Sequence, residues 1–259
     1  MSLKEFIRNN SKLLKCARTI RNWLNPLYVN PITGWLEYIR LFNDWRCYCA
    51  LGGIAYLGDF FPCLYDRTQE TPFDAHYFYQ GAWLSRRIGM AKTTKHVDIG
   101  SSVLTISVLS AQVETLFVDY RPLKVSLPGL TSIAGNILDL PFPDASIDSL
   151  SCLHVIEHIG LGRYGDPIDP QGSVKAALEL QRIVSRGGNL FLSLPIGRER
   201  VCFNAHRVHA PSSVLTLFPD MTLIEFSFVD DAGLYHEHQS VDAAIGLEYG
   251  CGLFHFQKA

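Results

Sequence analysis

The chain has 259 residues, of which 47% are hydrophobic, 19% charged and 12% aromatic. This composition is typical of a folded protein with a sizeable core and excludes wholesale disorder. The 23 lysines and arginines and 25 aspartates and glutamates give a net charge of -2, without the basic excess of a dedicated nucleic-acid-binding protein. The seven cysteines include no Cys-x-x-Cys pair, which argues against a disulfide framework or zinc knuckle and favours a reducing compartment, the cytoplasm.

The first 24 residues are predicted to form a basic amphipathic helix. They hold six lysines and arginines against one acid, Glu5, and their apolar residues recur at helical spacing. Such a helix could pack on its own domain or lie on the surface of an anionic membrane. The segment has no apolar stretch typical of a secretory signal. Residues 47–65 are apolar but contain Asp59, Pro62 and three glycines, so we expect a buried segment rather than a transmembrane span.

The pattern of the chain changes near residue 90, which predicts a domain boundary. Residues 1–90 are expected to form a mainly helical N-terminal extension or cap. Residues 91–259 alternate short apolar runs with helical stretches, which predicts a mostly parallel α/β sheet with helices on both faces. Seven strands are expected, at residues 96–100, 115–118, 132–135, 147–153, 190–194, 221–229 and 252–257, with helices at residues 103–112, at residues 174–184 and from Pro211.

Two acidic residues lie near the ends of the first two predicted strands, at a spacing typical of nucleoside binding. Asp98 and Asp119 are roughly 20 residues apart, and a carboxylate after the second strand can accept two hydrogen bonds from a ribose diol. Gly100 permits close approach of the backbone at the first turn, and the amides after it can bind an anionic group. The turn has one glycine where dinucleotide-binding proteins have three, so by itself it is equally consistent with an ordinary strand–helix connection.

The following segment resembles a known family. Gly-Asn-Ile-Leu-Asp-Leu-Pro-Phe-Pro-Asp-Ala-Ser-Ile-Asp at residues 135–148 and His-Val-Ile-Glu-His at residues 154–158 resemble class I S-adenosylmethionine-dependent methyltransferases of the small-molecule, type 11-like kind. The resemblance covers about residues 94–200 and implies a Rossmann-like fold that uses S-adenosyl-L-methionine as methyl donor. Residues 74–88 and 157–207 are most similar to an uncharacterised methyltransferase-like family of unknown function, which indicates no substrate.

The resemblance implies a set of cofactor-binding residues. They are Asp98, Gly100 and Ser101 at the methionine end, Asp119 with the neighbouring Tyr120 at the ribose, Asn136 and Ile137 at the adenine, and His154 at the sulfonium. The chain departs from the family at Asn136, where aspartate is usual, although an amide oxygen can still accept a hydrogen bond from adenine. It also departs at Ser101 and Ser102, which take the place of glycines and must supply the backbone amides.

The resemblance also implies where the acceptor would react. Methyl transfer is an in-line displacement on a sulfonium, so the enzyme mainly aligns the nucleophile with the methyl carbon. An alcohol acceptor also needs a general base, for which we expect His158, with Glu157 as its orienting partner or as a helix-capping residue. The following loop and the fifth strand could form a pocket for a small polar acceptor, such as a sugar or a glycan intermediate, or a salt-bridged scaffold. The residues concerned are Arg163, Tyr164, Asp166, His206 and Arg207; His76, Tyr77 and Gln80 could form a lid or pack in the core.

Two other functions stay open. The sequence His154-x-x-Glu157-His158 matches the inverted zinc-peptidase signature, in which two histidines hold zinc and the glutamate activates water. That chemistry needs a long helix, whereas here the motif follows a strand and runs into Gly160, so we expect no metal and keep the peptidase as a remote alternative. The nearer alternative is a catalytically inactive protein of the methyltransferase fold that binds a cofactor or a partner. The expected partner is a small-molecule acceptor, not a nucleic acid.

Overall fold

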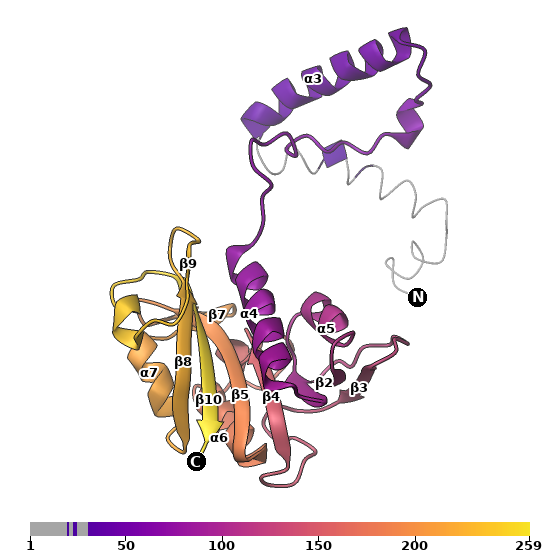
Figure 1. The fold of residues 1–259 in the computed structure, drawn as a ribbon. Coiled ribbons are helices and arrows are strands. Elements are labelled where there is room, and N and C mark those ends of the chain that lie inside the picture. Colours follow the sequence, from indigo (N-terminus) through magenta and orange to yellow (C-terminus); the bar gives the residue numbers. More distant parts are fainter. Residues whose placement is uncertain (1–19, 21–22, 25–30) are drawn as a thin grey trace. The chain divides into compact units, whose positions relative to one another are not determined.

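The computed structural model describes residue 20, residues 23–24 and residues 31–259. Most of the predicted basic helix of residues 1–24 therefore lies outside the described residues, and its membrane contact stays a prediction. The chain divides into two compact units, Met1–Pro72 and Phe73–Ala259 (Figure 1). In the part of the chain that is described, none of the helices combines the length and the apolar character needed to cross a bilayer.

The first unit contains helix α3 (Pro31–Ala50), the short 3-10 helix η1 (Leu57–Asp59) and a cluster of aromatic rings. The rings of Trp23, Tyr38, Phe42, Trp45 and Phe60 contact one another with centroids 5.6–6.5 Å apart. The expectation that residues 47–65 are buried is wrong, since most of their side chains are exposed, including Cys47 and Cys49. Among the described residues of this unit, the aromatic cluster takes only Phe60 from residues 47–65, and α3 ends at Ala50, before most of that segment.

The second unit is built on an eight-stranded sheet in the order β3-β2-β1-β4-β5-β10-β8-β9. The strands are β1 (Lys95–Ile99), β2 (Glu114–Asp119), β3 (Leu130–Ala134), β4 (Ile147–Leu153), β5 (Val184–Ile196), β8 (Met221–Val229), β9 (Tyr235–His236) and β10 (Gly250–Lys258). Strands β1 to β5 pair in parallel, whereas β10 is antiparallel to both β5 and β8. The seven expected strands are present, and the two-residue edge strand β9 adds an eighth. A separate hairpin, β6 (Arg200–Cys202) with β7 (His206–Val208), was not predicted.

Helices cover both faces of this sheet (Figure 1). One hydrophobic cluster joins α6 (Gly172–Ile183) and α7 (Pro211–Leu217) to one face, and a second joins α4 (Ala75–Ala91) and α5 (Val103–Leu109) to the other. The strands between the helices are buried on both sides, and the central pair also buries polar side chains, among them His96 and Asp98 of β1 and Ser151 of β4. Two 3-10 helices complete the unit, η2 (Ile156–His158) and η3 (Val241–Ala244).

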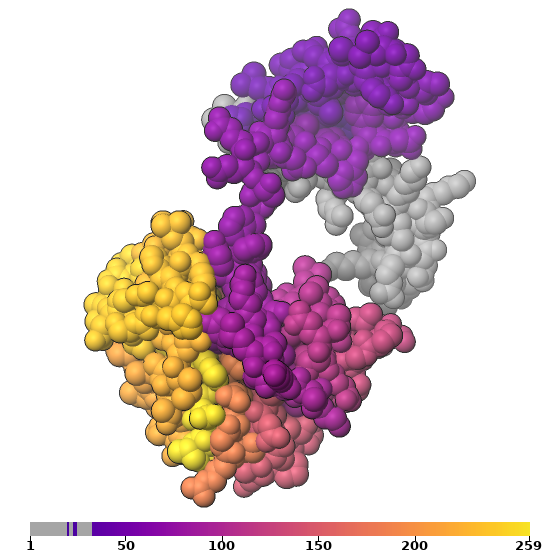
Figure 2. Space-filling model, viewed as in Figure 1, coloured from indigo at the N-terminus to yellow at the C-terminus, as the bar shows by residue number. Residues whose placement is uncertain are grey.

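Helix α4 belongs to the second unit. The division between the compact units therefore falls between Pro72 and Phe73 in the sequence rather than near residue 90. The helix begins at its N-cap Asp74, whose side chain accepts a hydrogen bond from the backbone of Tyr77. Trp83 and Arg87 on its buried face both donate to Glu225 of β8. Figure 2 shows the atoms of α4 lying directly against the C-terminal part of this unit. The change in sequence pattern near residue 90 therefore marks the end of this helix.

Candidate functional site

Two adjoining cavities lie at the carboxyl ends of the parallel strands. The larger has a volume of about 780 Å³ and the smaller about 330 Å³. Gly100, His154, His158 and Tyr164 line both of them, so the cavities meet at the ends of β1 and β4. The strand order reverses between these two strands, which is where open α/β sheets bind their ligands.

The smaller cavity brings together four of the residues predicted to bind the cofactor, Asp119, Tyr120, Asn136 and Ile137. The Oδ1 atom of Asp119 accepts a hydrogen bond of 2.7 Å from the backbone of Arg121. Asn136 Oδ1 accepts one of 3.1 Å from the backbone of Leu138. These bonds hold both side chains at the ends of β2 and β3, and the second carboxylate oxygen of Asp119 has no hydrogen bond among the described residues.

Gly100 forms the junction between the cavities. Its φ of +66° is a conformation that other residues rarely adopt. A Cβ atom at this position would lie 3.3 Å from Val155 Cγ1 and 3.5 Å from Asp119 Oδ2. A side chain here would therefore fill the space between the first turn and the carboxylate of Asp119, and glycine keeps it open.

Asp98 lines neither cavity and holds this turn through hydrogen bonds to Ser101, the residue after Gly100. It is fully buried, and its oxygens accept hydrogen bonds from the backbone and hydroxyl of Ser101 and from the hydroxyl of Ser151. Burial raises the pKa of Asp98 to about 6, against these hydrogen bonds, which lower it. The hydroxyl of Ser101, which lines the larger cavity, also accepts from the backbone of Leu153 at 2.9 Å. Asp98 thus ties the ends of β1 and β4 together.

His154 ends β4 and is held from several sides. Its φ of +55° is unusual for a residue other than glycine. Nδ1 lies 2.8 Å from Oε1 of Glu157, and Nε2 lies 3.4 Å from Sγ of Cys251. Burial disfavours a charged ring, but Cys251 and Glu157 raise the pKa of His154 to about 10.

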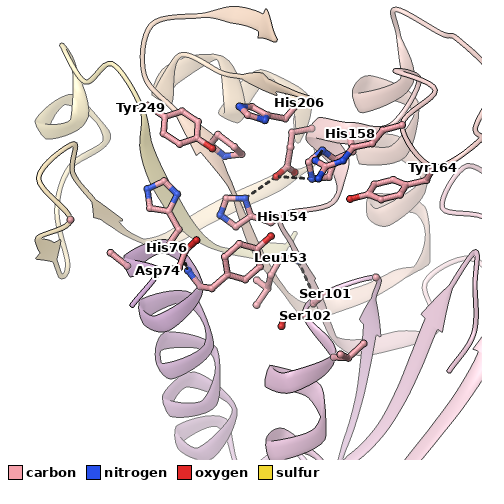
Figure 3. Close-up of a pocket in the computed structure, with 18 of the residues that line it drawn as sticks. Asp74, His76, Ser101, Ser102, Leu153, His154, His158, Tyr164, His206 and Tyr249 are labelled. Carbon is pink, nitrogen blue, oxygen red and sulfur yellow. Dashed lines mark hydrogen bonds and ion pairs between the residues drawn. The ribbon is translucent and has the colours of Figure 1, made fainter. Parts of the chain in front are cut away.

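The start of helix α4 covers His154 (Figure 3). The rings of His76 and Tyr77 stack on His154 with centroids 5.8 and 5.4 Å away, and both residues line the larger cavity. Gln80, one turn further along, is instead fully buried and accepts a hydrogen bond of 2.5 Å from Ser193. His76 and Tyr77 thus lie at the cavity, where a lid would be, whereas Gln80 belongs to the core.

Glu157 is fully buried in the wall of the larger cavity, on the three-residue 3-10 helix η2 rather than on a long helix. Burial opposes its ionisation, but the neighbouring histidines hold the pKa of Glu157 below its ordinary value. Its Oε1 atom is 2.8 Å from His154 and 3.8 Å from Nε2 of His158. Its Oε2 atom has no hydrogen-bond partner within the described structure, so the site contains a buried acceptor that lacks a donor.

His158 is oriented by Ala205 rather than primarily by Glu157. Its Nδ1 atom lies 2.7 Å from the carbonyl oxygen of Ala205, which can only accept, so Nδ1 carries the proton. The Nε2 atom of the neutral ring is then a proton acceptor. The ring is 8% exposed and lines both cavities.

The five residues predicted to bind the acceptor divide into two groups. Arg163, Tyr164 and His206 line the larger cavity, and the ring of Tyr164 lies 5.1 Å from the guanidinium of Arg163. Asp166 and Arg207 mainly hold the loop. Partial burial raises the pKa of Asp166, but hydrogen bonds from backbone amides, among them that of Gly160 at 2.7 Å, lower it overall.

Arg207 is the main support of residues 156–173. Its guanidinium is 8% exposed and donates to the carbonyl oxygens of Ile159 and Asp169 and to the hydroxyl of Ser173, at 2.7, 3.3 and 3.2 Å. It lines neither cavity, so the scaffold interpretation fits Arg207 better than contact with an acceptor.

Sequence reasoning missed the contribution of residues 249–251. Tyr249 lies between His76 and His206, with ring centroids 5.4 Å from each (Figure 3). Because β10 is antiparallel to β5, its first residues lie at the carboxyl ends of the parallel strands, with Cys251 opposite Pro195. No local signal near residue 250 indicates this placement.

Comparison with known proteins finds one family model that matches part of the chain and solved structures with a similar fold. Residues 131–242 match a family described as "Caenorhabditis protein of unknown function, DUF268". None of the curated proteins compared with the chain matches it. Among solved structures, the [4+2]-cyclase SpnF is 10% identical, with a TM-score of 0.52, and 70% of this chain aligns with 80% of that one.

A second structure, of a proposed sarcosine dimethylglycine methyltransferase from Galdieria sulphuraria, is 12% identical with a TM-score of 0.50, and 70% of this chain aligns with 85% of that one. At such identities the likeness concerns the fold, which hosts different reactions, as the cyclase illustrates. The fold expected from the sequence is confirmed: the chain has the Rossmann-like α/β fold of class I S-adenosylmethionine-dependent methyltransferases.

Proposed function

We propose that this protein is an S-adenosylmethionine-dependent methyltransferase that acts on a small polar acceptor. The observation that carries the proposal is the meeting of two cavities at Gly100 and His154, with the carboxylate of Asp119 in the smaller one. S-adenosylmethionine has an adenosine part and a charged sulfonium part, and the two cavities offer a separate environment for each. When bound, this cofactor supplies an electrophilic methyl group.

The residues of the smaller cavity fit an adenosine group. The free oxygen of Asp119 can accept from a ribose hydroxyl, next to the space that Gly100 keeps open. Ile137, 8% exposed, and the half-buried Leu138 provide apolar surface for a purine ring, and Asn136 provides a polar edge. Ser101 and Ser102 line the larger cavity, where the methionine end would lie.

The polar lining of the larger cavity fits a polar acceptor. Arg163, His206 and Tyr249 contribute donors and acceptors to its wall, and the unpaired Oε2 of Glu157 requires a donor. An acceptor hydroxyl or amine, as in a sugar, could supply that donor. We assign the base to His158, because Nδ1 donates to Ala205 and leaves Nε2 free to take a proton.

Calorimetric titration with S-adenosylmethionine and S-adenosylhomocysteine tests the cofactor. We expect both to bind, and Asp119→Asn to weaken binding at least about tenfold, because the neutral amide loses a charge-assisted hydrogen bond. Asp144→Asn is the matched control, since Asp144 is an exposed residue paired with Arg182 and lines neither cavity. No binding of either ligand to the wild type contradicts the proposal.

Turnover is tested separately by measuring S-adenosylhomocysteine release on a panel of hydroxyl and amine acceptors. We expect His158→Asn to lower the rate about 10²- to 10⁴-fold with an unchanged affinity for S-adenosylmethionine, as for the loss of a general base. Cofactor binding without turnover on any acceptor would instead favour a cofactor-binding protein without catalytic activity.

A further inference from the structure

Three side chains in and behind the larger cavity form a cluster of metal-binding atoms, and the proposed methyl transfer assigns no metal to it. His76, His154 and Cys251 each offer one ligand atom, and these atoms lie within 4.8 Å of one another. They come from the first turn of α4, the end of β4 and the start of β10. This cluster differs from the zinc-peptidase pattern in the sequence, because Nδ1 of His158 bonds to Ala205 and His158 is not among the three.

The spacing of the two central atoms matches that of ligands on one tetrahedral ion. Nε2 of His154 and Sγ of Cys251 are 3.4 Å apart. Zinc bonds of about 2.3 Å to sulfur and about 2.0 Å to nitrogen place two such ligands about 3.5 Å from each other. The ring of His76 stacks on that of His154, and its ligand atom lies within 4.8 Å of the other two, so this ring must turn toward them to share an ion.

The surroundings orient the cluster as in protein metal sites. The ring nitrogen of His154 opposite Nε2 is bonded to Glu157, and a metal-binding histidine typically uses its second nitrogen in this way. The backbone of His154 is held at a φ of +55°, which fixes where the ring points. Asp74, Asp230 and Asp231 also line the cavity and make it favourable for a cation.

We propose that His76, His154 and Cys251 bind a zinc ion whose fourth coordination position faces the larger cavity. A set of two imidazoles and one thiolate suits zinc, and three protein ligands are typical of sites with an open position. Binding of Zn²⁺ forms the Zn–S bond as the Cys251 thiol releases its proton to solvent, and Nε2 of His154 also releases its proton so that the imidazole binds as the neutral ring, with Nδ1 still bonded to Glu157.

A role for this ion in methyl transfer rests on the proposed function. An acceptor hydroxyl or thiol bound at the open position would lose its proton more readily, because the cation stabilises the anion. His158, which lines the same cavity, could take that proton. The zinc site itself does not depend on the cofactor, so the two proposals can fail separately.

Metal analysis and cobalt substitution of the full chain test the site. After treatment with a chelator and reloading with zinc, we expect one ion per chain by elemental analysis, in the absence of S-adenosylmethionine. With cobalt in place of zinc, we expect the near-ultraviolet charge-transfer band of a cobalt–thiolate bond. Cys251→Ser should abolish this band, and His76→Ala should lower the zinc affinity at least about tenfold.

Two further variants distinguish the loss of zinc binding from general effects of substitution on the fold. Cys202→Ser is the matched control, because Cys202 is a partly exposed thiol on β6 outside the cluster, and it should keep the full band. Glu157→Gln should lower zinc affinity about 10- to 100-fold while keeping the ion's ligands. If Cys251→Ser does not fold, Cys251→Ala replaces it, with folding checked by circular dichroism. Less than one zinc per chain in the wild type, or an identical cobalt spectrum in wild type and the Cys251 variant, overturns the proposal.

Discussion

The Nδ1 atom of His154 lies 2.8 Å from Oε1 of Glu157, and the two side chains are 6% and 0% exposed. Burial alone would favour the neutral form of both groups. Cys251 and Glu157 instead favour the charged form of His154 and raise its pKa, and His154 in turn lowers the pKa of Glu157. A buried ion pair therefore lies near the point where the two cavities meet. The protonation of His154 then contributes to the free energy of unfolding.

Stability should therefore fall as the pH rises above neutral. In the zinc-free chain, Cys251 and Glu157 raise the pKa of His154 from 6.5 to about 10, so the folded chain keeps a proton that the unfolded chain releases. This contribution is fully present below about pH 6.5 and is lost as the pH approaches 10, with a slope of up to about 1.4 kcal/mol per pH unit. The free energy of urea unfolding, measured across this range for wild type and His154→Gln, should show this slope only in the wild type.

His238→Gln serves as the control for that titration, because the side chain of His238 is 66% exposed. This variant should keep the wild-type dependence on pH. An unchanged slope in His154→Gln would mean that the histidine is not charged in the folded protein.

The sequence predicted the sheet well because short apolar or mixed runs alternate with turns and helical stretches. Residues 147–153 and 221–229 were expected as strands, and β4 and β8 have these same bounds. The sites at the ends of β1, β2 and β4 were also predictable, since the carboxyl ends of parallel strands share one edge of the sheet. Asp119 and His154 lie there as expected.

Two aspects of the site could not be predicted from the local sequence. Cys251 reaches His154 only because β10 inserts antiparallel between β5 and β8, and nothing in residues 250–258 specifies that insertion. Asp98 and Arg207 are chemically suited to bind ligands, but they bond to Ser101 and to loop carbonyls instead. Whether a polar side chain faces a cavity or the backbone depends on the path of distant segments, which spacing along the chain does not reveal.

Gly100→Ala should destabilise the fold and also remove cofactor binding. Its φ of +66° costs a residue with a Cβ atom about 1–2 kcal/mol, and the new atom would lie close to Val155 and Asp119. Gly187→Ala is the control, because Gly187 has a φ of +74° with open space around it and lines neither cavity. Both variants should melt at a lower temperature, and only Gly100→Ala should lose heat of binding with S-adenosylhomocysteine. Equal binding by both variants would show that the junction tolerates a side chain.

The attachment of α4 to β8 should depend on Glu225 much more than on Glu237. Both carboxylates pair with Arg87, which is 6% exposed, but Glu225 is 12% exposed and Glu237 is 44% exposed. Removing the buried partner leaves a buried guanidinium poorly paired, so Glu225→Gln should lower the free energy of unfolding by about 3 kcal/mol. Glu237→Gln should lower it by less than about 1 kcal/mol. Urea unfolding measures both, and similar losses for the two variants would contradict this ranking.

Arg207→Lys should loosen the loop that carries Glu157 and His158. The guanidinium bridges the carbonyl oxygens of Ile159 and Asp169 and the hydroxyl of Ser173, and an ammonium group cannot span these acceptors at once. We expect a loss of about 2–4 kcal/mol in the free energy of unfolding, because the nearly buried side chain of residue 207 loses several hydrogen bonds at once and the carbonyl of Ile159 loses its donor.

Arg198→Lys is the matched control for this substitution. Arg198 pairs with Glu248 on the surface, where their side chains are 63% and 65% exposed. It should change the stability by less than about 1 kcal/mol. Hydrogen exchange locates the effect: the amides of Gly160 and Gly162, which donate to Asp166, should exchange faster in Arg207→Lys than in Arg198→Lys. If these amides stay equally protected in both variants, Arg207 does not hold this part of the loop.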